Sequence, residues 1–433
     1  MSKIDRSEKG QFDFKDLAKS AIVGILAGLV AVLYRIIISN TDKITKAFKV
    51  LVKSDARYII IWAVILLACS VIVWLLLRFE KTIGGSGIPQ VKAELIDKLD
   101  SNWFKVLIAK IIAGATANIA GLSLGREGPS IQLGAMAGKG FAKLTKNDDC
   151  NKKMLISSGA SAGLAAAFNA PFAGVMFALE EMHHNFSTHI MLSAITASIT
   201  ADFVSKCVFG LKPVFDFGKV QTMPLKTFWL LIIFGLLLGL FGVGYNFVMK
   251  CLHKFYGKIK SNFIRILIPF VLAGVFMVVL PQVLGSGHAM LDEILEGNFA
   301  IKFLVLILVV KFIFSMFSFC SGVAGGIFLP MLVMGALVGK IFGEALAYAG
   351  VIEHVMVINF VILGMVGFFT AIVRAPITGI ILISEMTGSF SHMLPMLIVA
   401  VVAYIVAKTL KSKPVYDYLL DRLTVNVDNK TDE

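Results

Sequence analysis

Short glycine-containing segments stand directly before apolar runs at several places in this 433-residue chain. The clearest are GSGIP at 85–89, GREGP at 125–129 and GGIFLP at 325–330. Glycine and proline in this arrangement are typical of a helix start, where backbone N–H groups have no partner within the helix. A helix N-terminus carries roughly half a positive charge, so several starts aimed at one point would bind an anion. The pattern favours anion recognition by backbone dipoles.

Glu127 lies within GREGP and is the side chain there best suited to chemistry. One interpretation is a first-turn carboxylate that the helix dipole stabilises by about 0.3–1 kcal/mol. The other is a tethered anion that occupies the anion's own site and leaves when protonated. We favour the second, because ionisable groups within membrane spans are usually functional. For Arg126, a role in holding the loop and a role in adding local positive potential are equally open.

The elements that position these segments must lie in a membrane. The chain is 57% hydrophobic and only 16% charged, whereas soluble domains carry about 25% charged residues. Uncharged runs recur from residue 20 to residue 407, and a bilayer crossing needs roughly 20 apolar residues. We therefore predict an all-α polytopic membrane protein. Glycine and proline inside the runs 154–179 and 312–339 predict broken helices at membrane depth, where a binding site can satisfy the freed backbone groups.

An internal repeat organises these runs. GSGIP at 85–89 pairs with GSGHA at 285–289, and GREGP pairs with GIFLP at 326–330. The segments 168–182 and 373–386 also match, with Pro171 opposite Pro376. We divide the chain into an N-terminal segment (1–17), a first membrane repeat (18–208), a linker (209–223), a second membrane repeat (224–410) and a C-terminal helix with a short tail (411–433). Duplication of this kind indicates a transporter or channel with its site between the repeats.

The repeat indicates different roles for two adjacent glutamates, Glu180 and Glu181. Glu180 has a counterpart in Glu385, so we interpret it as structural, capping backbone near a helix junction. Glu181 has no acidic counterpart and is the better candidate for asymmetric chemistry such as passing a proton.

Several other classes of function find no support. The net charge of +13 is spread between apolar runs rather than gathered in a stripe, so nucleic-acid binding is not expected. The five cysteines show no disulfide or zinc spacing, no hydrolase or metalloprotease signature occurs, and we expect no enzyme activity, metal or cofactor. We assign surface or packing roles to four histidines and predict that the charged tail from Thr424 is disordered. Those histidines are His183, His184, His189 and His288.

The ordered set GSGIP, GREGP, GGIFLP, AAFNAP and RAPITG resembles the CLC family of chloride channels and transporters, over residues 18–421. The resemblance implies a homodimer with one anion pathway per subunit and two repeats of inverted topology. It also implies a multi-pass protein of a prokaryotic plasma (inner) membrane with both termini in the cytoplasm.

Carried over residue by residue, the resemblance implies a role for each matching position. Glu127 matches the gating glutamate and Glu181 the internal proton glutamate, while Arg126 and Gly128 flank and support the gate. The expected anion-binding residues are Gly85, Ser86, Ile327, Phe328 and Tyr416. Ser86 and Tyr416 indicate chloride rather than nitrate or fluoride. Glu127 together with Glu181 predicts secondary active chloride/proton antiport, and the alternative is a passive voltage-dependent chloride channel of the same family.

Overall fold

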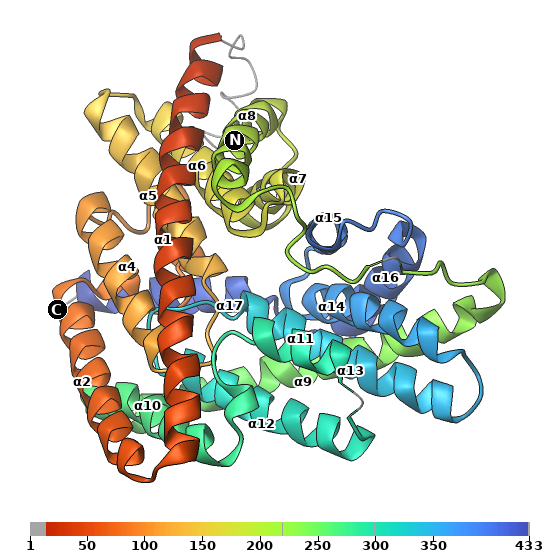
Figure 1. The fold of residues 1–433 in the computed structure, drawn as a ribbon. Helices are drawn as coiled ribbons and strands as arrows, with labels where there is room; N and C mark the ends of the chain where they lie inside the picture. Colours follow the sequence, from red (N-terminus) through yellow and green to blue (C-terminus); the bar gives the residue numbers. More distant parts are fainter. Residues whose placement is uncertain (1–13, 219, 298, 432–433) are drawn as a thin grey trace.

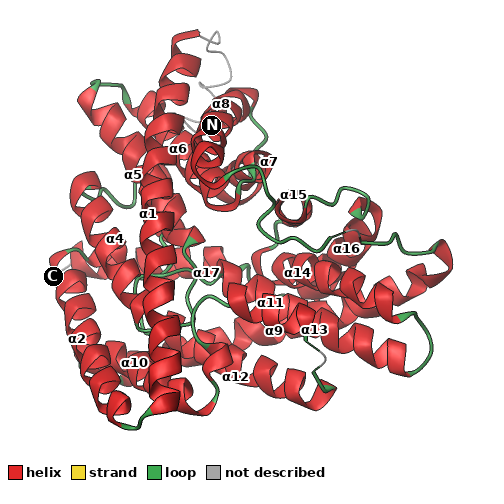
Figure 2. Cartoon of the chain, viewed as in Figure 1, coloured by secondary structure: helices red, strands yellow, loops and turns green. Residues whose placement is uncertain are grey.

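The computed structural model describes residues 14–218, 220–297 and 299–431, and the regular structure in them is helical (Figure 2). The helices of the first half are α1 (Phe14–Ser54), α2 (Arg57–Phe79), α3 (Ile88–Leu95), α4 (Trp103–Ile119), α5 (Glu127–Leu144), α6 (Asp149–Phe168), α7 (Pro171–Met176) and α8 (Thr188–Phe209). Those that follow are α9 (Phe228–Lys258), α10 (Asn262–Val279), α11 (His288–Glu296), α12 (Ile301–Cys320), α13 (Phe328–Tyr348), α14 (Val357–Val373), α15 (Pro376–Thr387), α16 (Met393–Thr409) and α17 (Val415–Thr431). The all-helical prediction is confirmed.

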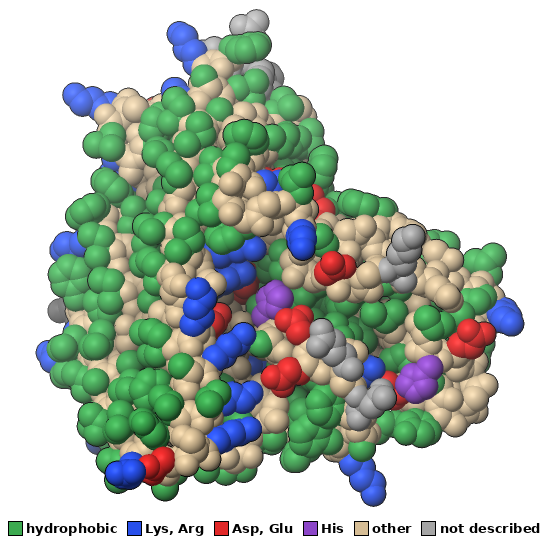
Figure 3. Space-filling model, viewed as in Figure 1, with side chains coloured by type: hydrophobic (Ala, Val, Ile, Leu, Met, Phe, Trp, Pro, Cys, Tyr) green, Lys and Arg blue, Asp and Glu red, His purple; other side chains and the backbone are tan. Residues whose placement is uncertain are grey.

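Eight of these helices are long and apolar enough to cross a bilayer. Their outward faces carry large apolar side chains such as Leu33, Ile60, Phe247 and Val271, each more than half exposed. Figure 3 shows apolar side chains spread widely over one face of the molecule. Apolar surface on this scale is stable only against lipid, so the protein is a multi-pass membrane protein.

Glycines in matching positions bring the central helices of each half together. A methyl group on Gly134 of α5 would lie 2.2 Å from the carbonyl oxygen of Gly159 on α6. On α13, a methyl group on Gly335 would lie 2.3 Å from the carbonyl oxygen of Gly364 on α14. Only glycine permits such close backbone approach, which is typical of helix pairs in membranes.

The predicted breaks lie at particular residues of the two runs. In the run 312–339, α12 ends at Cys320 and α13 begins at Phe328, so residues 321–327 form the break. In the run 154–179 the chain leaves α6 after Phe168 and restarts at Pro171. Gly159, by contrast, lies inside α6 and serves packing.

The C-terminal end of the chain differs from expectation. Helix α17 continues through Thr431, so the prediction of a disordered tail from Thr424 is wrong for residues 424–431. Most of the predicted N-terminal segment, residues 1–13, lies outside the described residues.

In Figure 1, α17 runs behind α1, so the last helix returns to the first half of the chain. It packs there against α3, which follows the GSGIP loop.

Candidate functional site

Two buried lysines hold the paired GSG loops. The Lys110 ammonium donates to the carbonyl oxygens of Ile83 and Gly85, each at 2.7 Å. The Lys311 ammonium donates to Val283 at 2.9 Å and to Gly285 at 2.6 Å. Both lysines are fully buried. Each ammonium satisfies carbonyls that a non-helical loop leaves without partners, and so fixes that loop inside the protein.

The loops of the two repeats also pair with each other. Gly125 and Gly326 exchange backbone hydrogen bonds of 2.6 and 2.7 Å, and Gly85 accepts from Gly325 at 3.0 Å. The GREGP and GGIFLP segments therefore meet where α5 and α13 begin. The Gly85 N–H donates to Val323 at 3.1 Å, so in this structure it is not free to coordinate an anion. Gly85 holds the loop, a role that the sequence interpretation did not assign to it.

Ser86 and Gly128 lie in contact at this meeting point. A methyl group on Gly128 would lie 2.5 Å from the Ser86 hydroxyl oxygen, so a larger residue at 128 would displace that side chain. Ser86 is 2% exposed, and its hydroxyl has no hydrogen-bond partner in the structure. A buried polar atom without a partner is uncommon and calls for an explanation such as a bound ion.

Glu127 is 1% exposed and lies at the start of α5. Its carboxylate faces the backbone N–H of Leu329 in the first turn of α13, and its Oε2 has no hydrogen-bond partner. The Arg126 Nε lies 4.0 Å from the other carboxylate oxygen, which is the longest of the ion-pair contacts in this region. The Glu127 carboxylate thus occupies the position that suits an anion at the N-terminus of α13.

Backbone and side-chain donors adjoin Glu127. Ile327 and Phe328 cap and begin α13, so their N–H groups have no acceptor within the helix. Tyr416, at the start of α17, is fully buried, and its hydroxyl has no hydrogen-bond partner. It lies within electrostatic range of both Glu127 and Glu181. The residues expected to bind an anion, Gly85 apart, therefore offer unused donors in one region.

A cavity of about 590 Å³ opens toward this region. Its lining includes Gly125, Arg126 and Leu329, which flank Glu127, and its walls carry charged side chains. Those side chains are Asp42, Lys46 and Lys49 from α1 and His288, Asp292 and Glu293 from α11. Figure 3 shows a hollow with basic side chains along one side and acidic and histidine side chains along the other. The cavity thus reaches the residues that adjoin Glu127.

Glu181 occupies a second buried position with a different environment. It is 2% exposed and accepts a hydrogen bond of 3.0 Å from Lys92, a residue of α3 that is itself 4% exposed. Lys92 also donates to Asp417 at 2.7 Å, and Asp417 directly follows Tyr416. Sequence reasoning identified Glu181 but missed Lys92 and Asp417.

Glu180 and Glu385 each cap the start of a helix in the opposite repeat. Glu180 accepts from the N–H groups of Ile377 and Thr378 at 3.2 and 2.7 Å, at the start of α15. Glu385 accepts from Phe172 and Ala173 at 3.1 and 2.8 Å, at the start of α7. The structural interpretation of this pair is confirmed.

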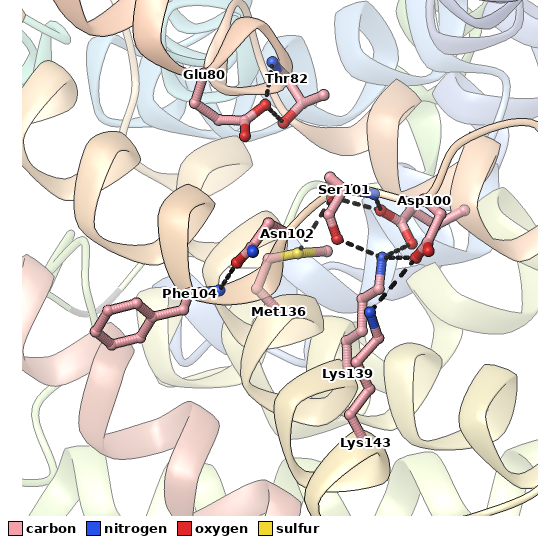
Figure 4. Close-up of polar contacts among 10 residues, drawn as sticks. Glu80, Thr82, Asp100, Ser101, Asn102, Phe104, Met136, Lys139 and Lys143 are labelled. Atoms are coloured by element: carbon pink, nitrogen blue, oxygen red, sulfur yellow. Dashed lines mark hydrogen bonds and ion pairs between the residues drawn. The ribbon is translucent and has the colours of Figure 1, made fainter.

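A further ion-pair cluster anchors α3, which carries Lys92, to α5, which carries Glu127 (Figure 4). Lys139 of α5 is fully buried and contacts Glu94 of α3, and it donates to Ser101 O at 2.7 Å. Its third partner is Asp100 at 2.6 Å. Three acceptors around a single ammonium satisfy its three donors, which a buried charge requires. No cluster of metal-ligating side chains occurs in the described part of the chain.

With one buried glutamate beside opposed helix starts and another in an ion-pair cluster, the site can be compared with those of known proteins. The model of the voltage-gated chloride channel family matches residues 68–408. The chain therefore belongs to the CLC family, whose members are ion channels and transporters rather than enzymes.

Curated relatives of the chain are bacterial exchangers. It is 34% identical to the H(+)/Cl(−) exchange transporter ClcA of Vibrio parahaemolyticus, over 96% of this chain and 92% of that protein. It is also 34% identical to the ClcA of Klebsiella pneumoniae, over 94% of this chain and 88% of that protein.

Solved structures show the same fold. A slow cyanobacterial Cl⁻/H⁺ antiporter matches with a TM-score of 0.90 and 28% identity, covering 96% of this chain and 99% of its own. A CLC-type fluoride/proton antiporter matches with a TM-score of 0.77 and 21% identity, covering 94% of this chain and 98% of its own. The second match supports the fold alone.

The sequence contains patterns that point to some of the site residues that the sequence analysis did not name. Lys110 and Lys311 lie 201 positions apart, which is the spacing of the repeat, and each interrupts an apolar run. Lys92 is the only basic residue within α3. His184, assigned a surface role, lies 3.4 Å from the Lys92 ammonium and pairs with Asp417, so that assignment was incomplete.

Proposed function

We propose that this chain is a secondary active chloride/proton antiporter with Glu127 as the gate and Glu181 as the proton site on the α17 side. The observation that carries the proposal is the presence of two buried carboxylates, one at opposed helix starts and one in an ion-pair cluster. The names of the relatives, all exchangers of these two ions, support the choice of substrates.

The Glu127 carboxylate acts as a tethered anion. While ionised, it faces the start of α13 and occupies the position that chloride would take. Protonation removes its charge and its attraction to the helix N-terminus, so the side chain moves aside and chloride enters. Chloride then binds to the Ser86 and Tyr416 hydroxyls and to the N–H groups of Ile327 and Phe328. These are dipoles rather than full charges, so the ion is held weakly enough to leave.

The Glu181 carboxylate receives the protons that reach Glu127. Tyr416 lies within electrostatic range of both carboxylates, and Asp417, the next residue, accepts a hydrogen bond from the Lys92 ammonium that also contacts Glu181. Arg126 and Gly128 support the gate, the first by its charge and the second by leaving room for Ser86. A carboxylate at position 181 favours the antiporter over the passive channel, because it supplies a proton carrier beyond the gate.

The same proposal includes an assembly and a location. The protein is a homodimer in a prokaryotic inner membrane, with both termini in the cytoplasm, one anion pathway per subunit and two repeats of inverted topology at 18–208 and 224–410. No ATP-binding motif is needed, because the gradient of one ion drives the other.

Purified protein in liposomes tests the exchange. An imposed chloride gradient should drive protons uphill in the wild type, and Glu127→Ala should leave chloride flux without proton movement. Chloride flux in the wild type with no accompanying proton flux would establish the passive channel instead.

A further inference from the structure

The Lys92 ammonium occupies a site with one acceptor for each of its donors. An ammonium has three N–H groups, and here the acceptors are Glu181 Oε1 at 3.0 Å, Asp417 Oδ1 at 2.7 Å and His184 Nε2 at 3.4 Å. These acceptors come from two elements, because Glu181 and His184 belong to the π-helical turn Phe177–His183 and its C-cap, and Asp417 belongs to α17. Lys92 therefore bridges groups that the chain brings together from distant positions.

The cluster runs from solvent to the interior. The His184 side chain is 57% exposed and that of Asp417 is 29% exposed, whereas Lys92 is 4% and Glu181 2% exposed. Lys92 thus contacts both the buried Glu181 and His184, whose side chain water reaches. A proton that moves between solution and Glu181 along this side of the protein meets His184 and Lys92 in that order.

Resting on the antiport proposed above, we propose that His184 and Lys92 form the proton relay that serves Glu181, with Asp417 holding both groups in place. A proton from solution binds Nε2 of His184. The Lys92 Nζ–H bond breaks as a bond to Glu181 Oε1 forms, which leaves a neutral amine and a carboxylic acid. His184 then returns its proton to Nζ, so the net change is one proton moved from solution to Glu181.

Burial disfavours the charged form of Lys92, but Glu181 and Asp417 together raise the pKa of its ammonium, so the neutral amine is short-lived and His184 must return a proton to it. With His184 neutral, Lys92, Glu181 and Asp417 together carry one negative charge, and protonation of His184 neutralises it. The His184 imidazole, 3.7 Å from Asp417, and the Lys92 ammonium hold the pKa of Asp417 well below its usual range. Asp417 is therefore more easily ionised than a free carboxyl group. Asp417 also raises the pKa of His184. His184 can therefore accept a proton at a pH closer to 7.

The other titratable group near His184 takes no part in the relay. His183 is half-buried, directly precedes His184 in the chain, and its Nε2 forms a 2.6 Å hydrogen bond with Ser157. The groups that face His184 are thus Lys92 from α3, Glu181 and His183 from the turn, and Asp417 from α17.

Replacing Lys92 by arginine tests whether residue 92 transfers a proton or only contributes its positive charge. Arginine keeps the positive charge and the ion pairs, but its guanidinium does not release a proton in proteins. In liposomes, Lys92→Arg should lower proton flux by about tenfold or more, the order of a lost proton-transfer group, with chloride flux close to that of the wild type. A merely structural lysine would leave proton flux unchanged in this variant.

A second variant covers the case in which arginine does not fit. His184→Gln changes an exposed side chain and should slow proton flux and flatten its dependence on pH between about 6 and 8, around the ordinary pKa of histidine. His354→Gln is the matched control, because His354 is also an exposed histidine beside a carboxylate, Glu344, but lies outside the cluster. The control should match the wild type.

The outcomes distinguish the relay from the antiport itself. Coupled fluxes in the wild type that persist unchanged in both Lys92→Arg and His184→Gln would overturn the relay and leave the antiport standing. A wild type that moves no protons would overturn both.

Discussion

In the first half of the chain Lys110 holds the loop that bears Ser86, and in the second half Lys311 holds the loop that bears Ser286 through the matching carbonyls. Farther along, Glu180 and Glu385 cap the helix starts of the opposite repeat. These contacts are duplicated because they build the frame that both halves need.

The ionisable chemistry is not duplicated. The position of Glu127 is occupied by Phe328 in the second repeat, that of Glu181 by Met386, and that of Lys92 by Asp292. The second repeat contributes backbone donors at the start of α13, and the first contributes Glu127 and Glu181, the carboxylates to which we assign proton movement. A residue kept in both halves is therefore expected to affect stability, and a residue kept in one half is expected to affect coupling.

The largest effect is expected at Glu181, which has no acidic counterpart in the second repeat. Glu181→Gln should reduce proton flux by about 100-fold or more, because the amide cannot carry a proton while it keeps the shape of the side chain. Chloride flux should continue. Simultaneous recording of both fluxes in liposomes checks this, and proton coupling that survives the change would assign the proton site elsewhere.

Loss of either loop-holding lysine should destabilise the protein. Lys110→Met and Lys311→Met each leave two loop carbonyls unpaired, at about 1–3 kcal/mol for each carbonyl. Thermal unfolding of the purified protein should show a similar drop in Tm for both. Chloride flux should fall more in Lys110→Met, because its loop bears Ser86. Equal flux in the two variants would show that the two loops are functionally equivalent.

A smaller effect is expected at the duplicated glutamates. Glu180→Gln and Glu385→Gln weaken a charged cap of a helix start, which is worth about 1–2 kcal/mol. Both should lower Tm by similar amounts, and both should keep the ratio of proton to chloride flux of the wild type. A changed ratio in Glu180→Gln alone would place this residue in the proton route together with its neighbour.

The smallest effect concerns Asp417. Its pKa is lowered in the folded protein, so the stability it contributes is present above its unfolded value of about 3.9 and is lost as pH falls below that. Asp417→Asn should therefore lower Tm slightly at neutral pH and match the wild type at strongly acidic pH. A difference in Tm that grows as pH falls would contradict this assignment.

The sequence predicted much of the fold because repetition and apolar runs are local patterns. The breaks before Phe328 and Pro171 and the helix starts follow from residues that are neighbours in the chain, and the capping role of Glu180 follows from its counterpart Glu385 in the repeat. Glu127 was identifiable for the same reason, since its motif places it at a helix start.

The rest depends on contacts between distant segments. Lys92 and Asp417 are 325 positions apart in the chain, and only the packing of α17 on α3 brings them together. The bonding of the Gly85 N–H to Val323 likewise could not be read from the GSGIP motif, which by itself predicts a free donor. Glycine inside the run 154–179 predicts a break, yet Gly159 packs within α6 because α5 approaches it closely.

The most direct test of the central claim is the reversal potential of the reconstituted wild type, with equal chloride on both sides and a tenfold proton gradient. Coupled exchange predicts a reversal potential displaced from zero, and Glu181→Gln should return it to zero. A wild-type reversal potential of zero would contradict chloride/proton antiport.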